Sequence, residues 1–343
     1  MRIKNLFSSA ITFAMLISVL VVSSAQSYTE ISRTSLPGNE GWDYLTMDSG
    51  ARLLYLSRST RIVVFNVDTH KVVGEIGGLQ GVHGVAIASA LGKGFTSNGR
   101  DNSVTVFDLK SFKTLDKIDV GKGPDAILYD PACKRVFTFN GGDNSATAID
   151  VLTNKVVGTI QLGGRPEAGI ADGHGTIFVN IEDKSEVISF SSSSLKMGIR
   201  HSLAPGDGPS GLGYDPVKKQ LFSVCSNQKM MITSIAGSRP VADVAIGNGA
   251  DACVFDPVTH LAFSSNGRDG TLTVVKEGAG SAYTVLKTEP TQPGARTMAL
   301  DTKTHHIFTC TAKMMPQAPG ETNPRRRSYE PGSYVVLEYG GKK

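Results

Sequence analysis

Seven polar residues recur along the chain at nearly constant spacing, each close to the start of a short apolar run such as "VHGVAIA" or "PDAILYD". Steps of 40, 42, 42, 43, 41 and 45 residues separate Asp43, His83, Asp125, Glu167, Ser210, Asp251 and Arg296. Four carboxyl groups, one imidazole and one guanidinium could hold a divalent cation, transfer a proton or stabilise an oxyanion. Each of these roles requires a fold that gathers residues from the whole chain.

The segments between these residues repeat with the same period, so the chain consists of seven units of about 42 residues. Asn98 and Asn140 are 42 residues apart, and Asn140 and Asn266 are 126 apart, three times that step. Each unit contains short strand-like runs separated by turn pairs such as Asp130-Pro131. Four antiparallel strands at this period, seven times over, predict an all-β, seven-bladed β-propeller of four-stranded blades.

The last unit lacks one strand. It has strand-like runs at 297–301, 306–311 and 333–339, and residues 28–37 ("YTEISRTSLP") form a run with no unit of their own. If this N-terminal strand completes the last blade, the ring closes and two open sheet edges disappear. We therefore expect residues 26–343 to form a single propeller domain, with a loop insertion at 313–332 in the last blade.

In a propeller the starts of the innermost strands surround one mouth of the central channel, and the loops joining second and third strands emerge on the same face. The seven residues should therefore form a ring, and its candidate ligand-binding members are Asp43, His83, Asp125, Glu167, Asp251 and Arg296. Crowded carboxyl groups must protonate, pair with cations or bind a metal. The candidate ligands of Ca²⁺, Mg²⁺ or Zn²⁺ are Asp125, Glu167, Asp251 and His83. Arginine side chains, ordered water or a cationic ligand are the alternatives.

A loop phrase recurs on that same face: "SNGRDN", "FNGGDN" and "SNGRDG". Asparagine, glycine and aspartate are typical of tight turns, which favours a structural role for Asn98, Asn140 and Asn266. A turn does not need arginine, so Arg100 and Arg268 are as suited to ligand binding as to a solvated loop. We keep all five as candidate ligand-binding residues.

Two further features border this face. Trp42, the only tryptophan, is adjacent to Asp43, where it could pack in the core or form an apolar wall for a ligand. The insertion at 313–332 contains Arg325, Arg326 and Arg327, which could bind an anion or a nucleic acid or simply be solvated.

The first 25 residues have a basic start, an apolar stretch and small residues at a cleavage site, which indicates a secretory signal peptide. We expect a periplasmic or secreted protein without a membrane anchor in the mature chain. Removing two bases leaves a formal charge of +2, which gives no compositional case for nucleic-acid binding. The disulfide status of the four scattered cysteines is left open: Cys133, Cys225, Cys253 and Cys310.

Units such as "GPDAILYDPACKRVFTFNGGDNSATAIDVLTNKVVGTIQLG" resemble the YVTN-type repeat of YncE-like propellers, over essentially the whole mature chain. The resemblance implies an exported seven-bladed propeller, and one relative is described as binding single-stranded DNA. More distant similarity extends to the propeller domains of nitrous-oxide reductase and cytochrome cd1 nitrite reductase, and to lactonases. This chain lacks the C-x-x-C-H motif of covalent haem, and its ring has one histidine where a multinuclear copper site would need many. We expect no haem, nicotinamide or flavin cofactor.

No complete catalytic motif is present; "GPSGLG" around Ser210 lacks the second glycine of G-x-S-x-G. The sequence therefore favours a protein that binds a small molecule or a protein partner on the ring-bearing face. The first alternative is a lactonase-like, metal-assisted hydrolase or lyase, in which ring acids hold the metal, His83 or Glu167 moves a proton and Arg296 stabilises an oxyanion. The second is single-stranded nucleic-acid binding through the arginines of the insertion and the loops.

Overall fold

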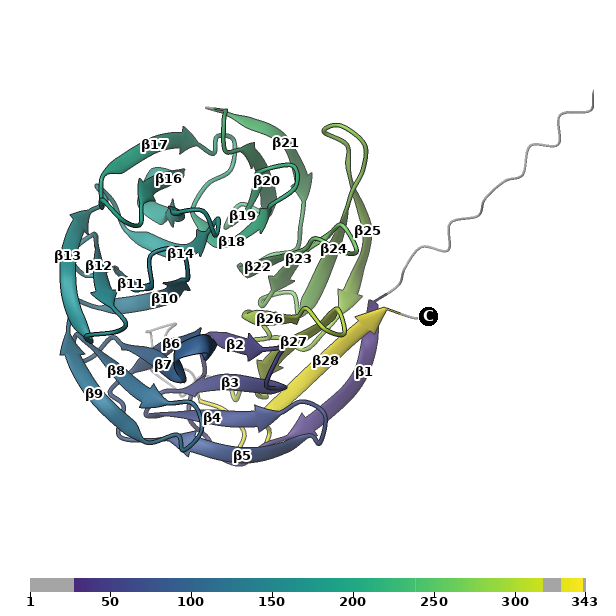
Figure 1. The fold of residues 1–343 in the computed structure, drawn as a ribbon. Helices are drawn as coiled ribbons and strands as arrows, with labels where there is room; N and C mark the ends of the chain where they lie inside the picture. The colour runs from purple at the N-terminus through teal and green to yellow at the C-terminus, as the bar shows by residue number, and fades with distance from the viewer. Residues whose placement is uncertain (1–27, 238, 317–327, 342–343) are drawn as a thin grey trace, which may run out of the picture.

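The computed structural model describes residues 28–237, 239–316 and 328–341, which form seven four-stranded antiparallel sheets. Figure 1 shows these sheets as blades around a common axis, in chain order. The predicted all-β, seven-bladed propeller is confirmed. Helical structure in this part of the chain is confined to two single-turn 3₁₀ helices, η1 (Ser89–Leu91) and η2 (Glu182–Lys184). Neither is long or apolar enough to span a bilayer.

Each of blades one to six is a consecutive run of four strands, and the seventh combines both ends of the chain. Blades one to three comprise β2 (Leu45–Asp48), β3 (Leu53–Arg58), β4 (Arg61–Asn66), β5 (Lys71–Ile76); β6 (Val82–Ala88), β7 (Lys93–Asn98), β8 (Ser103–Asp108), β9 (Thr114–Asp119); β10 (Pro124–Asp130), β11 (Arg135–Asn140), β12 (Ser145–Asp150), β13 (Lys155–Gln161). Blades four to six comprise β14 (Pro166–Ala171), β15 (Thr176–Ile181), β16 (Glu186–Ser191), β17 (Met197–Ser202); β18 (Pro209–Asp215), β19 (Gln220–Cys225), β20 (Lys229–Ser234), β21 (Pro240–Ala245); β22 (Ala250–Asp256), β23 (Leu261–Asn266), β24 (Thr271–Glu277), β25 (Tyr283–Pro290). Blade seven contains β26 (Met298–Asp301), β27 (His306–Thr311), β28 (Val335–Gly341) and β1 (Tyr28–Ser35).

The hydrophobic core lies between neighbouring blades. The middle strands are buried along almost their whole length, because both faces of each blade pack against a neighbour, whereas outer strands such as β13 are mostly exposed. Between blades three and four, for example, Phe137 and Phe139 of β11 pack with Ile177 of β15 and Phe190 of β16. This packing holds the innermost strands in a rigid ring.

The N-terminal strand closes that ring, as predicted. In Figure 1 β1 (purple) runs beside β28 (yellow), and the two pair antiparallel from Tyr28 opposite Gly341 to Ser35 opposite Val335. Tyr28 is buried, packs edge-on against Phe263 at 4.8 Å and donates a hydrogen bond to the backbone oxygen of His305 at 2.9 Å. Contacts to blades six and seven therefore fix this strand.

Local irregularities in the innermost strands lie where the ring residues occur. In blades two to six the pairing of the first two strands shifts register over a short segment, and each segment contains one ring residue: His83, Asp125, Glu167, Ser210 or Asp251. A bulge lets a strand redirect a side chain. Serines of the second strands hold these segments in place; Ser97, for example, accepts a hydrogen bond from the backbone N–H of Gly84 at 2.9 Å and donates one to the backbone oxygen of Asp125.

Candidate functional site

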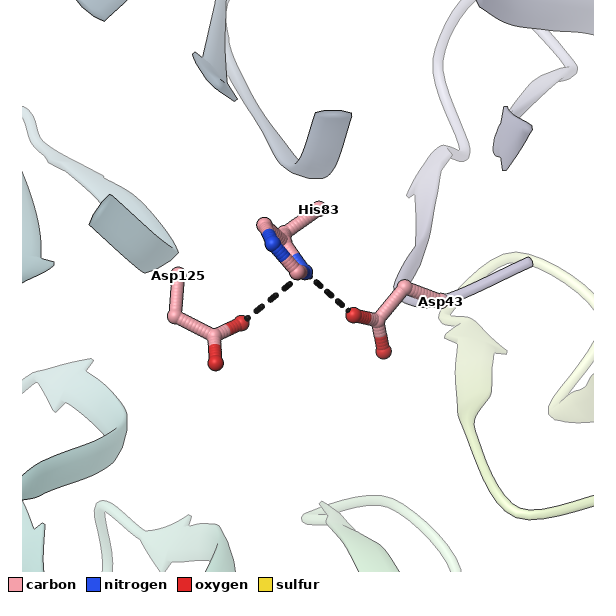
Figure 2. Close-up of side chains that lie close together, drawn as sticks. All are labelled: Asp43, His83 and Asp125. Carbon is pink, nitrogen blue, oxygen red and sulfur yellow. Dashed lines mark hydrogen bonds and ion pairs between the residues drawn. The ribbon is translucent and has the colours of Figure 1, made fainter. Parts of the chain in front are cut away.

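Five of the seven ring residues form one continuous chain of charged contacts across the channel mouth. Arg296 Nε lies 2.9 Å from Asp251 Oδ2, and Arg296 Nη2 lies 3.1 Å from Asp43 Oδ1. Asp43 Oδ2 lies 2.6 Å from His83 Nδ1, which is 3.5 Å from Asp125 Oδ1. Figure 2 shows His83 between the two aspartates. Acidic and basic side chains alternate along this chain of contacts, which runs from blade six through blades seven, one and two to blade three. The negative charge of the acids in it is therefore largely neutralised by protein groups.

The remaining negative charge perturbs the titration of this network. Burial raises the pKa of Asp251 to about 6, although Arg296 opposes the shift. Burial also raises the pKa of Asp125, with His83 opposing it. Burial alone would lower the pKa of His83, but its hydrogen bond to Asp43 and the charges of Asp125 and Asp43 raise it overall. The mouth therefore binds protons more readily than the same groups do in water.

Glu167 and Ser210 occupy the other side of the ring. Glu167 Oε1 lies 3.4 Å from Arg165 Nη2, and Arg165 also contacts Glu182 Oε2 at 3.1 Å. Burial, together with the charges of Asp125 and Glu182, raises the pKa of Glu167 to about 9. This carboxyl group therefore holds its proton to higher pH than a free glutamate does, even with Arg165 beside it. The Ser210 hydroxyl donates to the backbone oxygen of Ala250 at 3.1 Å.

The loop asparagines serve their own blades. Asn140 Nδ2 donates to Ser145 Oγ at 2.9 Å and to Thr147 Oγ1 at 3.0 Å, while its Oδ1 accepts from Thr138. Asn98 and Asn266 repeat this arrangement, and all three side chains are buried. They tie the second strand to the third, so we leave them out of the proposed ligand site.

In two of the three copies, Gly99 and Gly267, the glycine of the phrase makes room for a ring residue. A Cβ on Gly99 would lie 2.6 Å from His83 Nε2, and one on Gly267 would lie 2.6 Å from Arg296 Cβ. Neither glycine has a positive φ. The residue with a positive φ is the sixth and last of each phrase, Asn102, Asn144 or Gly270. The backbone conformation that a turn requires is therefore adopted at the end of the phrase, and Gly99 and Gly267 instead allow ring residues to approach the backbone closely.

Arg100 and Arg268 hold equivalent positions in blades two and six, and both are exposed. The stem of each arginine lies against a glycine of the preceding linker: a Cβ on Gly81 or Gly249 would lie 2.6 Å from the arginine Cγ. Both glycines have positive φ, 65° and 73°, which disfavours any side chain there. The two arginines are thus positioned alike, but their surroundings differ.

A pocket of about 260 Å³ opens on the ring-bearing face between blades six and seven. The side chains that line it include Trp42, Tyr329, Arg268, Arg296 and Asp251. Trp42 is 6% exposed, and its ring lies 4.8 Å from that of Tyr329 at an interplanar angle of 51°. The tryptophan therefore packs in the core and also forms part of the pocket wall, so both expected roles apply.

Beneath the ring, a narrower cavity of about 180 Å³ follows the channel axis. Its lining comes from the innermost strands of all seven blades and combines apolar side chains such as Leu45, Val85 and Leu212 with a nearly equal share of polar surface. Tyr44 also lines this cavity and packs against the core between blades three and four. Burial, with the charges of the four ring acids, raises the pKa of Tyr44 well above its ordinary value. The charged ring therefore lies above a channel that presents both polar and apolar groups.

Asp43, His83 and Asp125 have donor atoms within 4.8 Å of one another, which is compatible with a divalent metal ion. This set differs from the expected one, because Glu167 pairs with Arg165 and Asp251 pairs with Arg296. A metal here would displace the short Asp43–His83 contact. The donor set of two carboxylates and one imidazole suits Zn²⁺ better than Ca²⁺.

Only the stem of the predicted insertion belongs to the described residues. Met314 pairs with Tyr329 in an antiparallel bridge, and the Glu330 N–H donates to the backbone oxygen of Lys313 at 2.8 Å. This stem carries Tyr329 to the pocket. Arg325, Arg326 and Arg327 lie outside the described residues, as does the predicted signal peptide. The four cysteines are free thiols, and three of them are buried.

Sequence reasoning missed three residues of this face: Tyr44, Arg165 and Asn248. Tyr44 directly follows Asp43, and Arg165 stands two positions before Glu167, so adjacency to the ring residues was the available signal. Asn248 belongs to a glycine-rich linker that lines the pocket, and nothing in its spacing distinguishes it from the other linkers.

No protein-family model matches the chain, and comparison with curated proteins gave no match. Among solved structures, the chain is similar to the structure of U3-55K, with a TM-score of 0.75 and 11% identity. The alignment covers 89% of this chain and 98% of that one. Because 1809 solved chains match, this fold alone does not select a function. The comparison shows that the chain has the β-propeller fold.

Proposed function

We propose that this chain is an exported, YncE-like propeller that binds a small molecule on its ring-bearing face. The observation that carries the proposal is the pocket between blades six and seven, where an aromatic wall and an exposed arginine meet beside the charged ring. Small-molecule sites are commonly concave, with apolar walls and a few polar groups that orient the ligand. The ring acids support binding rather than catalysis, because arginines and His83 already occupy them.

Trp42 provides a direct test, because it is the only tryptophan and lines the pocket. We expect members of a compound set spanning anions, cations and neutral molecules to change its fluorescence saturably and to raise the melting temperature. Asn248→Phe, which fills the pocket, should abolish both effects. The control Val217→Phe lies in the turn after β18, at the opposite end of the strand from the ring, and should abolish neither. If only protein partners from the same compartment bind, the small-molecule assignment is wrong.

Export is a separate part of the proposal and has its own test. Fractionation of cells that make the full chain should yield a mature protein beginning near residue 26 in the periplasm or medium. An uncleaved cytoplasmic product would contradict it.

The metal-assisted hydrolase or lyase is a second candidate, favoured by the cluster of Asp43, His83 and Asp125. It predicts stoichiometric Zn²⁺ or another divalent ion in the purified protein, and loss of that ion in His83→Ala. The matched control is His305→Ala, a histidine that contacts Asp256 away from the ring. A metal-free protein whose melting curve does not respond to chelator or added Zn²⁺ would exclude this candidate.

Single-stranded nucleic-acid binding is the third candidate, and of its five arginines Arg100 and Arg268 belong to the described residues and are exposed. It predicts oligonucleotide binding that weakens steeply with salt. Binding that is absent at low salt would exclude it.

A further inference from the structure

The blade six–seven pocket has features that restrict the chemistry of its ligand. We propose, resting on the function above, that this pocket selects an aromatic monocarboxylate. The aromatic ring packs on the wall formed by Trp42 and Tyr329, and the carboxylate pairs with Arg268.

The aromatic wall is rigid because it is supported from behind. Trp42 packs against Tyr334 at a centroid distance of 5.7 Å, and the buried guanidinium of Arg58 lies 3.6 Å above the Tyr334 ring. Tyr329 reaches Trp42 from the stem of the insertion, beside Met314. A flat ring placed against this wall contacts Tyr329 and the small part of Trp42 that lines the pocket, and aromatic contacts add to simple area burial.

The charge balance of the pocket favours one negative group on the ligand. Arg296 is paired with Asp251 and Asp43, so its charge is already compensated. No carboxylate within the described ranges 28–237, 239–316 and 328–341 forms an ion pair with Arg268, although its side chain lines the same pocket. A guanidinium binds a carboxylate through two parallel hydrogen bonds. Arg268 is therefore the expected anchor for a single anionic group.

The arginine is also held in place at the rim. Its stem lies against Gly249, where a Cβ would come within 2.6 Å of Arg268 Cγ, and its backbone N–H donates to Asn248 at 3.2 Å. A positioned side chain loses less entropy on binding than a free one. Arg100 is held in the same way against Gly81, so the pocket that Arg268 lines is what sets it apart.

The size of the pocket excludes larger anions, and the negative charge of Asp251 disfavours anions with a second carboxylate. The pocket volume of about 260 Å³ is slightly below the range typical of drug-sized ligands, about 300–1,000 Å³, so one ring with a short acid side chain fits. Asp251 also lines the pocket and would repel a second carboxylate. An aliphatic acid of the same length would satisfy Arg268 but not the aromatic wall.

The experiment uses the mature protein and four probes, of which three are nearly equal in size and the fourth is larger by one carboxylate. Phenylacetate has both the ring and the charge; phenylacetamide lacks the charge, cyclohexylacetate lacks the aromatic ring, and phenylmalonate has a second carboxylate. Trp42 fluorescence and calorimetry report binding. We expect phenylacetate to bind at least about ten-fold more tightly than each of the other three, as the loss of a charge-assisted pair or an aromatic contact predicts.

Variants identify the anchor. Arg268→Gln should weaken phenylacetate binding about ten-fold or more, whereas Arg100→Gln, the equivalent arginine of blade two, should change it by less than about two-fold. Arg268→Lys should restore only part of the affinity, because lysine cannot form the paired hydrogen bonds. Equal affinity for phenylacetate and phenylacetamide, or equal effects of the two glutamine variants, would overturn the proposal.

The failure of this inference is distinguishable from the failure of the proposed function. If phenylacetate does not bind but a cation or a neutral compound changes Trp42 fluorescence, the pocket binds ligands of another class and only the inference is wrong. If no compound of any class affects Trp42 or the melting curve, the inference and the small-molecule function are both wrong.

Discussion

Blades two and three and the seam where blades six, seven and one meet contain the same loop phrase, but they differ in what surrounds it. In blade two Arg100 extends from a regular loop. At the seam Arg268 lines a pocket with Trp42 and Tyr329. The tryptophan stands at a repeat position where the other units have valine, proline or alanine, and the tyrosine comes from the insertion, which does not belong to the repeat. The difference teaches that the repeat builds the framework, whereas departures from it supply the chemistry.

The seam also closes the ring, because β1 pairs there with β28. Removing β1 is therefore the most severe test of the difference between the seam and the regular blades. We expect deletion of residues 28–36 to cost at least about 5 kcal/mol, because burial of a large aromatic such as Tyr28 alone contributes about 3–5 kcal/mol. That loss is comparable to the whole stability of an ordinary domain. Thermal melts and chemical denaturation would measure it.

The control stays within the same strand. Ile31 is 49% exposed, and Ile31→Ser should change stability by no more than about 0.5 kcal/mol. A deletion variant that melts cooperatively within a degree or two of the parent would show that the seam is not needed to hold the ring.

Replacing a framework asparagine in the regular region should have the next largest effect. Asn140→Ala removes three hydrogen bonds to the hydroxyls of Thr138, Ser145 and Thr147, which are worth about 1 kcal/mol each, and it leaves the buried Thr138 hydroxyl without a partner. We expect a loss of about 3 kcal/mol by urea denaturation. Asn144→Gly, at the left-handed position of the same loop, should be almost neutral. Equal costs for the two would show that the phrase is not a hydrogen-bonded framework.

The regular part of the molecule was predictable from sequence because its constraints recur. A period of about 42 residues, with Asp-Pro turns and alternating strands, specified the blades, the missing strand and the ring of residues such as Asp43 and Asp125. Each constraint appears several times in the chain, so one ambiguous copy does not change the conclusion. The propeller topology then predicted that these residues meet in one ring, and no individual contact had to be known.

The pairing within the ring could not be predicted in the same way. Which base meets which acid depends on side-chain geometry at the bulges, so the partnership of Glu167 with Arg165 has no periodic signal. The pocket depends on Tyr329, which an irregular segment brings to Trp42. A segment that occurs only once in the chain has no repeated copies in the sequence, so its contacts cannot be inferred by comparing units.

A glycine pair offers a finer comparison of the two regions. Gly267→Ala at the seam places a methyl group 2.6 Å from Arg296 Cβ and 3.1 Å from its Cα, so the backbone must move, at about 1–3 kcal/mol. Gly99→Ala in blade two meets the imidazole of His83, which can rotate away, and should cost less than about 1 kcal/mol. Chemical denaturation gives both values. If Gly99→Ala were the costlier change, the glycines would not serve the close approach of ring residues.

The smallest expected effect is a pH dependence that originates in the ring rather than in the seam pocket. Glu167 has a folded-state pKa of about 9, well above its unfolded value, so the folded protein binds the extra proton between these two values. Stability from this group is therefore greatest at acidic pH and falls as the pH rises toward 9. Asp251, with a pKa of about 6, acts in the same direction at lower pH, and His83, whose pKa is also raised, loses its contribution as the pH rises.

We therefore expect the unfolding free energy to decrease by about 1–2 kcal/mol between pH 5.5 and 8.5. This is less than the full linkage of about 1.4 kcal/mol per pKa unit, because the mouth is open to water. Glu167→Gln should remove most of the slope and stabilise the protein at high pH, since the glutamine cannot ionise beside Asp125 and Glu182. Glu330→Gln, an exposed acid on the insertion stem, should leave the slope unchanged. A Glu167→Gln profile parallel to that of the parent would show that this carboxyl group titrates normally, and the ring would then retain more negative charge than its pairing implies.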